Sequence, residues 1–142
     1  MDNEDTEPVN SPVPENSPKL EDDSEKLLRH IKPAWFHNGV PSSQNFEPMP
    51  KDRSHLSVER GSQIDAKTAH TRWISWGRES AAVCSVTVGA YQENSAPCFH
   101  VPVDDPGEEN PEHALVQYPD VRSQASKLAK KIKKKAKVEF IP

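Results

Sequence analysis

Hydrophobic positions near the C-terminus recur every three or four residues, which is the spacing of one face of a helix. Lysines fill most of the positions between them. The pattern predicts an amphipathic helix over residues 121–138, with an apolar side that docks on the domain and a cationic side in solvent. The apolar positions are Val121, Ala125, Leu128, Ala129, Ile132 and Ala136.

Two other segments show helical spacing. Three aliphatic residues between Ser24 and Pro33 predict a short first helix, which Ser24 caps and which ends before the proline. Another helix is predicted from Asp65, a good N-cap, to Gly77, a residue typical of helix ends. The apolar side of this helix carries Ala66, Ala69, Trp73 and Ile74.

Strand patterns occur in four places. Residues 55–60 alternate polar and apolar side chains, and residues 81–88 are the most apolar run of the chain. The first pattern predicts a half-buried strand and the second a buried one. Residues 98–103 and 114–118 predict two more strands, the former near a sheet edge because it contains a proline. Thr87 could alternatively cap a short helix that starts there.

Together these elements predict an α+β fold, a small single domain with three or four short strands and two or three helices. We expect the domain to cover residues 24–142 and the basic helix 121–138 to close it. Residues 33–54 form a long stretch in which prolines recur. Its three aromatic residues are expected to pin it to the core; they are Trp35, Phe36 and Phe46.

Composition changes this picture at both ends of the chain. Only 33% of the 142 residues are apolar, 28% are charged and fourteen are prolines, so part of the chain is not expected to pack. Residues 1–23 carry eight acids against one lysine, whereas residues 122–142 carry eight bases against one glutamate. The acidic segment 1–23 has too few apolar side chains to offset its ordering entropy, and we expect it to be disordered.

Composition also narrows the class of protein. No run of about 18 apolar residues is present, so we expect no transmembrane helix and no membrane partner. The acidic N-terminus lacks the apolar stretch of a signal peptide. Two cysteines do not make a disulfide-rich secreted scaffold. We therefore expect a cytoplasmic protein.

Complete catalytic motifs are missing from the sequence. Neither a nucleophile elbow G-x-S-x-G nor a glycine-rich phosphate loop is present. The candidates for catalytic roles are Ser42 and Ser43 in the loop 39–46, together with Arg60 and His113. A small enzyme would need them to meet in one pocket. Otherwise the two serines are ordinary turn or helix caps.

The C-terminal lysines are the candidate surface for a partner or an anion. They are Lys127, Lys130, Lys131, Lys134 and Lys135. Such a run can attract an acidic protein, or release counterions from nucleic acid. It lacks aromatic side chains for base stacking and arginines for base reading, so nucleic-acid binding would not depend on sequence. A plain solvated helix face has the same pattern.

We expect neither a metal nor a cofactor. The six histidines and two cysteines include no pair with the spacing of a structural zinc site. The nearest feature, Cys98-Phe99-His100, is not a recognised ligand pair.

Several short motifs occur together in the chain: G-V-P-S-S-Q-N-F at 39–46, L-S-V-E-R at 56–60, V-T-V-G-A at 86–90, N-P-E-H-A-L-V at 110–116 and L-A-K-K at 128–131. In combination they resemble a group of small, mainly bacterial proteins with no established function. The resemblance covers residues 27–137 and implies one compact domain, without an activity, a cofactor or a catalytic residue. If the motifs mark a site, they indicate Ser42, Ser43, Phe46, Arg60, Asn110 and His113.

Three observations favour a non-enzymatic accessory protein that binds a protein partner. They are the incomplete catalytic motifs, the oppositely charged ends and the aromatic residues of the proline-containing stretch. A small enzyme, with its polar site at the loop 39–46, Arg60 and His113, is the first alternative. Binding of nucleic acid by the lysine-rich helix, without sequence preference, is the second.

Overall fold

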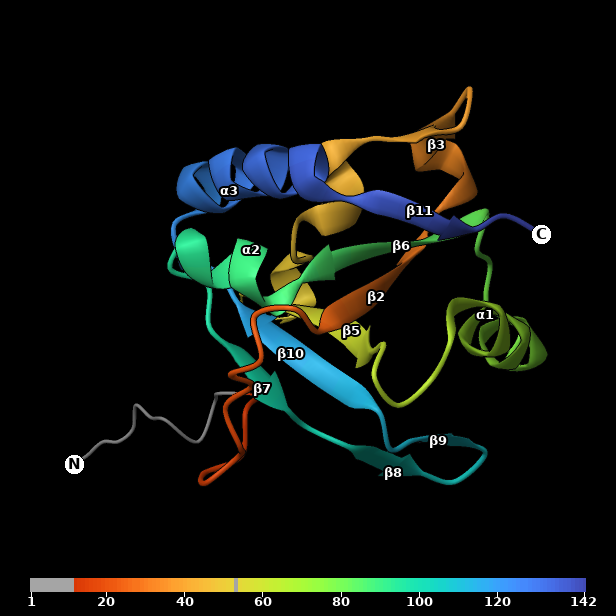
Figure 1. Ribbon diagram of the computed structural model, residues 1–142, viewed down its shortest axis with the longest axis horizontal. Coiled ribbons are helices and arrows are strands. Elements are labelled where there is room, and N and C mark those ends of the chain that lie inside the picture. Colours follow the sequence, from red (N-terminus) through yellow and green to blue (C-terminus); the bar gives the residue numbers. More distant parts are fainter. Residues whose placement is uncertain (1–11, 53) are drawn as a thin grey trace.

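A six-stranded antiparallel sheet forms the centre of the molecule, with helices on both of its faces (Figure 1). The computed structural model describes residues 12–52 and 54–142. The strand order in the sheet is β11-β6-β2-β5-β10-β7. In that order the strands span Lys137–Phe140, Ala82–Thr87, Lys26–Ile31, His55–Arg60, His113–Gln117 and Cys98–His100. The α-helices are α1 (Ala66–Ser75), α2 (Val88–Glu93) and α3 (Arg122–Lys135).

Successive strand residues point to opposite faces of the sheet, so the sheet has two cores. The larger core lies under α2 and α3, where Leu27 packs with Ile132. The smaller core lies under α1, where Leu28 packs with Ala69 and Val83. Each face of the sheet is therefore fixed by its own helices.

Short elements connect the main ones. Two small hairpins are formed by β3 (Phe36–His37) with β4 (Val40–Pro41) and by β8 (Val103–Asp105) with β9 (Glu108–Asn110). Three 3-10 turns lie in the proline-containing stretch: η2 (Pro33–Trp35), η3 (Ser43–Phe46) and η4 (Pro50–Asp52).

Several predicted elements are confirmed. The strands at 55–60 and 81–88 are β5 and β6, the latter with five buried residues in sequence. The helix from Asp65 is α1, whose Thr68 N–H is accepted by the Asp65 side chain. Thr87 ends β6 and also caps α2, because its side chain accepts the Ala90 N–H. These elements are set by local sequence, and the prediction of a mixed single domain holds.

The segment predicted as the first helix is instead the strand β2. Leu27 and Leu28, which the helical pattern places on one face, lie in different cores. β2 pairs along its whole length with β6 and also with β5 at two positions. A helix this short is marginal on its own, whereas a central strand gains backbone hydrogen bonds from neighbours on both sides.

The basic helix does not close the domain. α3 ends at Lys135 rather than at 138, because Ala136 has extended backbone angles. The chain then forms β11, which pairs with β6 and places Phe140 against the smaller core. With β11 and the two small hairpins, the described residues contain ten strands, not the three or four predicted.

The ordered part of the chain begins earlier than predicted. Leu20 is only 5% exposed, and its N–H donates to the carbonyl of Cys98. The His100 N–H donates to the carbonyl of Pro18, so this segment lies along β7. The prediction that all of residues 1–23 are disordered is therefore wrong for this segment. Residues 1–11 lie outside the described residues.

The proline-containing stretch is held by Phe46, which is fully buried in the larger core. Its neighbour Asn45 is 1% exposed. The Asn45 side chain accepts the Lys32 N–H and donates to the carbonyls of Trp35 and Ser42. This stretch therefore follows a defined course with only short turns and one small hairpin, and η3 packs against α3.

Candidate functional site

α3 has a buried side and a charged side. Its buried residues are Ala125, Leu128, Ala129 and Ile132, which belong to the larger core. The five predicted lysines are all exposed, and we call them the lysine face: Lys127, Lys130, Lys131, Lys134 and Lys135. Within residues 12–52 and 54–142, none of the five makes an ion pair. A docked helix therefore presents five positive charges that have no ion-pair partner in the described part of the chain.

Negative charge gathers elsewhere, on the hairpin of β8 and β9. Its acids are Asp104, Asp105, Glu108 and Glu109. In Figure 1 this hairpin and α3 lie at opposite corners of the view. The formal net charge of the chain is −4, so the lysine face is a local exception to the overall charge.

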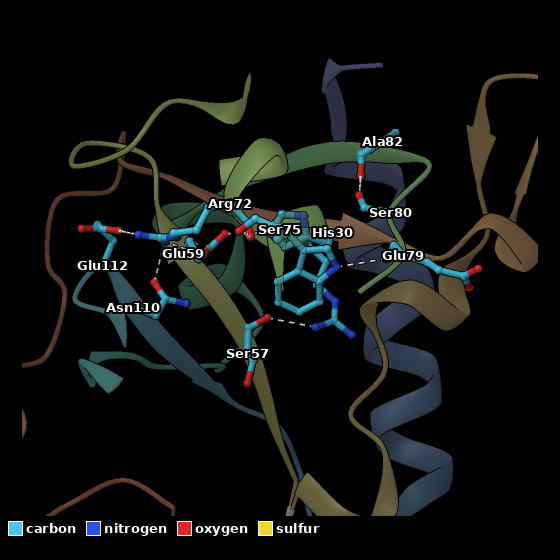
Figure 2. A network of polar contacts seen from close by, with 12 residues as sticks. His30, Ser57, Glu59, Arg72, Ser75, Glu79, Ser80, Ala82, Asn110 and Glu112 are labelled. Carbon is cyan, nitrogen blue, oxygen red and sulfur yellow. Dashed lines mark hydrogen bonds and ion pairs between the residues drawn. The ribbon is translucent and has the colours of Figure 1, made fainter. Parts of the chain in front are cut away.

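A second group of charged residues lies under α1 and is largely buried (Figure 2). Glu59 of β5 accepts hydrogen bonds from His30 Nε2 and from Arg72 Nη2, each at 2.8 Å. Arg72 also donates to Glu112 Oε1 at 2.7 Å and to Asn110 Oδ1 at 2.8 Å. We call these five residues the Glu59 cluster. They connect α1 to β2, β5 and the end of the β8–β9 hairpin.

Ionisation is favoured at both central members of the Glu59 cluster. Burial by itself would raise the pKa of Glu59, but the hydrogen bonds and charges of His30 and Arg72 outweigh it and lower this pKa. Burial likewise disfavours the charged form of Arg72, yet Glu59 and Glu112 raise its pKa. The His30 ring also stacks on Trp73, with ring centroids 4.1 Å apart. These contacts make an ion-pair network that fastens α1 to the sheet, although His30 Nδ1 and Arg72 Nε are buried without a hydrogen-bond partner among the described residues.

A small cleft opens beside this cluster, where β2 and β5 separate. The strands pair at Leu27 with Arg60 and at Leu28 with Glu59, and Arg29 then reaches across to donate to the Ser57 carbonyl. The cavity that remains has a volume of about 30 Å³. It has room for a water-sized group but is about a tenth of the volume of the smallest usual ligand pockets.

His113 also lines this cleft. Burial lowers the pKa of His113, although the carbonyl of Val101 and the charge of Glu59 favour its protonated form. The Nδ1 atom donates to that carbonyl at 2.7 Å, which fixes the orientation of the ring. His113 therefore has a free basic nitrogen, but beside it there is no space for a substrate.

The predicted catalytic residues are not brought into one pocket. Ser42 precedes η3 and Ser43 begins it, and η3 packs against α3. His113 lies on the other face of the sheet, in the cleft beside Trp73 of α1. Arg60 makes a two-point ion pair with Glu25 at 2.8 and 3.0 Å. The two serines, Arg60 and His113 therefore lie in three separate structural environments.

Sequence reasoning did not identify the Glu59 cluster. Glu59 occupies a polar position of an alternating strand, a pattern that normally places the side chain in solvent. Its partners His30 and Arg72 are 29 and 13 residues away in the chain. No local pattern distinguishes a buried carboxylate with distant partners from an exposed one, so only the fold brings this cluster together.

Comparison with protein-family models, with curated proteins and with solved structures finds no match for the chain. The resemblance carried by the short motifs remains a prediction. Every helix in the described part of the chain is too short or too polar to cross a membrane. Within the same residues, no three His, Cys, Asp or Glu side chains gather as they would around a metal ion.

Proposed function

We propose that this chain is a non-enzymatic binding protein that holds an acidic protein partner on the lysine face. The observation that carries the proposal is the exposure of five lysines, without ion pairs among the described residues, on a helix whose other side is docked. Held this way, the charges can act together on a partner, which steers association and selects for complementary charge.

The placement of the other candidate residues supports a binding role over catalysis. Ser42 and Ser43 lie on one face of the sheet and His113 on the other. Arg60 is engaged by Glu25. The cleft beside His113 is too small for a substrate, which argues against acid–base chemistry on an organic substrate there.

The charge distribution favours an acidic protein over nucleic acid. An extended polyanion would also approach the acidic β8–β9 hairpin and the rest of a chain whose net charge is −4. The lysine face itself has no aromatic side chain on which bases would stack. A compact acidic segment of a protein can contact the lysine face and avoid the remaining surface.

Capture from a native lysate tests this proposal. The lysate is divided into nuclease-treated and untreated halves, and proteins retained by the full chain are identified by mass spectrometry. The variant Lys130→Glu/Lys134→Glu is compared with Lys19→Glu/Lys67→Glu, which changes the net charge equally at exposed positions outside α3. We expect a nuclease-resistant partner that the first variant loses and the second retains.

Two results would contradict the proposal. Retention of the partner by both variants would remove the lysine face from the interaction. Loss of all captured material after nuclease treatment would instead assign the lysine face to nucleic acid.

A further inference from the structure

Two hollows lie side by side where the proline-containing stretch meets the start of α3. Their volumes are about 260 Å³ and 190 Å³. Both are lined by Glu47, Pro48, Met49, Pro50 and Arg122, so one short segment separates them. We call the pair the anchor groove. Each hollow is large enough for a bulky side chain but smaller than a usual cofactor site.

The walls of the anchor groove combine apolar side chains with the carboxylate of Glu47 and, in the larger hollow, that of Asp120. Trp35 adds an aromatic wall to the smaller hollow, and Pro119 lines the larger one. The side chain of Met49 lies between them and is one of the exposed large apolar residues, at 37%. Rigid prolines, an aromatic ring and an adaptable methionine are the lining that suits apolar anchors of a peptide.

The anchor groove ends at Arg122, the first residue of α3, and further basic residues follow along this helix. Arg122 lines both hollows and has an 82% exposed side chain, 3.9 Å from Glu47. Lys133 lies eleven residues further on, about three turns and about 16 Å along the same side of the helix. Lys130, a member of the lysine face, lies three residues before Lys133, on the neighbouring ridge of the helix. Because Glu47 and Asp120 line the groove itself, the acids of a ligand meet predominantly positive charge only beyond it, along α3.

We infer that the anchor groove receives apolar side chains of the same partner that the lysine face holds. The ligand is then a protein segment with one or two apolar anchors and a run of acidic residues beside them. A distance of about 16 Å corresponds to about five extended residues, which sets the spacing between anchors and acids. This inference rests on the proposed function, because the lysines decide the charge of the occupant.

The two parts of such a site have different physical roles. Apolar anchors buried in a groove supply most of the affinity of a peptide interface. Charges on an exposed helix face supply association rate and selectivity and are weakened by salt. A substitution in the anchor groove should therefore raise the rate at which the ligand dissociates. Lys130→Glu/Lys134→Glu should mainly lower the rate at which the ligand associates.

Selection from a phage-displayed library of short random peptides on the full chain tests the inference. We expect enriched peptides to carry apolar residues about five positions from a cluster of acids. Their affinity should fall about tenfold or more in Met49→Glu and in the same direction in Met49→Ala, which adds no charge. Ile74→Glu, at another exposed apolar residue on α1, is the matched control and should leave the affinity unchanged. Circular dichroism confirms that each variant is folded.

The outcomes separate this inference from the proposed function. Enriched peptides that are acidic but lack apolar anchors, or that bind Met49→Glu and Met49→Ala as wild type, overturn the anchor groove alone. Peptides whose affinity survives Lys130→Glu/Lys134→Glu contradict the proposed function. A selection that enriches no peptide above the uncoated surface overturns the inference as well.

Discussion

Glu59 carries a negative charge at a position that is only 3% exposed. Moving a carboxylate out of water costs several kcal/mol, which attraction repays only where the partners are well placed. His30 and Arg72 meet this condition, with both contacts at 2.8 Å. Glu59 thus has a structural role. This role accounts for the buried charges of the Glu59 cluster, a feature that is also typical of catalytic sites.

Replacing Glu59 by Gln keeps the shape of the side chain and removes its charge. We expect the free energy of unfolding to fall by about 3 kcal/mol, since His30 and Arg72 lose a shared partner in a buried site. Denaturant titration measures the loss. Glu109→Gln, at an exposed position of the β8–β9 hairpin, should leave the stability close to that of wild type. Equal stability of Glu59→Gln and wild type would contradict the role assigned to the cluster.

The same residue predicts a pH dependence with a definite sign. The pKa of Glu59 is lower in the folded state than in the unfolded chain. Its contribution is therefore complete above the unfolded value of about 4.3 and is lost as the pH falls through the lower, folded value. We expect the stability difference between wild type and Glu59→Gln to be constant at neutral pH and to shrink below about pH 4. A difference that grows in acid would have the wrong sign.

β11 begins two residues after the end of α3, within a segment whose sequence pattern predicted one continuous helix. The chain turns from α3 at Ala136 and pairs with β6, and Phe140 contacts the smaller core and the ring of His70. The sheet edge and α1 therefore both depend on the last strand.

Truncation tests that dependence. A chain ending after Ala136 loses β11 and exposes the edge of β6, and we expect it to lose about 2–3 kcal/mol of stability from the buried part of Phe140 and the lost pairing. A chain that lacks only Ile141 and Pro142 is the matched control, because both residues are exposed and follow β11. Equal melting temperatures of the two truncated chains would show that β11 does not support the sheet.

The elements also show what sequence reasoning can and cannot predict. The caps Asp65 and Thr87 depend on neighbours within one turn, and both were predicted correctly. Of the predicted apolar side of the C-terminal helix, the four central positions are buried, whereas Val121 is 53% exposed. β2 was wrongly predicted as a helix, because Leu27 and Leu28 are compatible both with one face of a helix and with the two opposite faces of a strand. Pairing partners far along the chain decide such cases, and the sequence does not specify them locally.

The candidate sites divide in the same way. The lysine face was predicted from its spacing, since exposure on a helix follows from periodicity. The anchor groove and the Glu59 cluster were not predicted, because each consists of residues from distant segments that only the tertiary fold brings together. The serines and His113 were grouped by chemical type, and the sheet then separates them onto its two faces.

At the scale of the whole molecule, the distribution of charge matters more than its sum. The net charge is −4, yet an acidic hairpin and the helix that carries the lysine face lie at opposite corners of the view in Figure 1. Such a molecule orients itself in the field of a partner before contact, and it discriminates against partners with a basic surface. The groove beside Arg122 then offers the apolar contact that charge alone does not provide.

The affinity of the captured partner as a function of salt concentration tests the central claim most directly. Between about 0.1 M and 1 M salt the screening length falls from about 10 Å to 3 Å, which removes most long-range attraction between exposed charges. We predict that wild type loses affinity steeply over this range, and that Lys130→Glu/Lys134→Glu binds weakly with a flatter dependence. An affinity that is independent of salt and equal in the two proteins would contradict a working role for the lysine face.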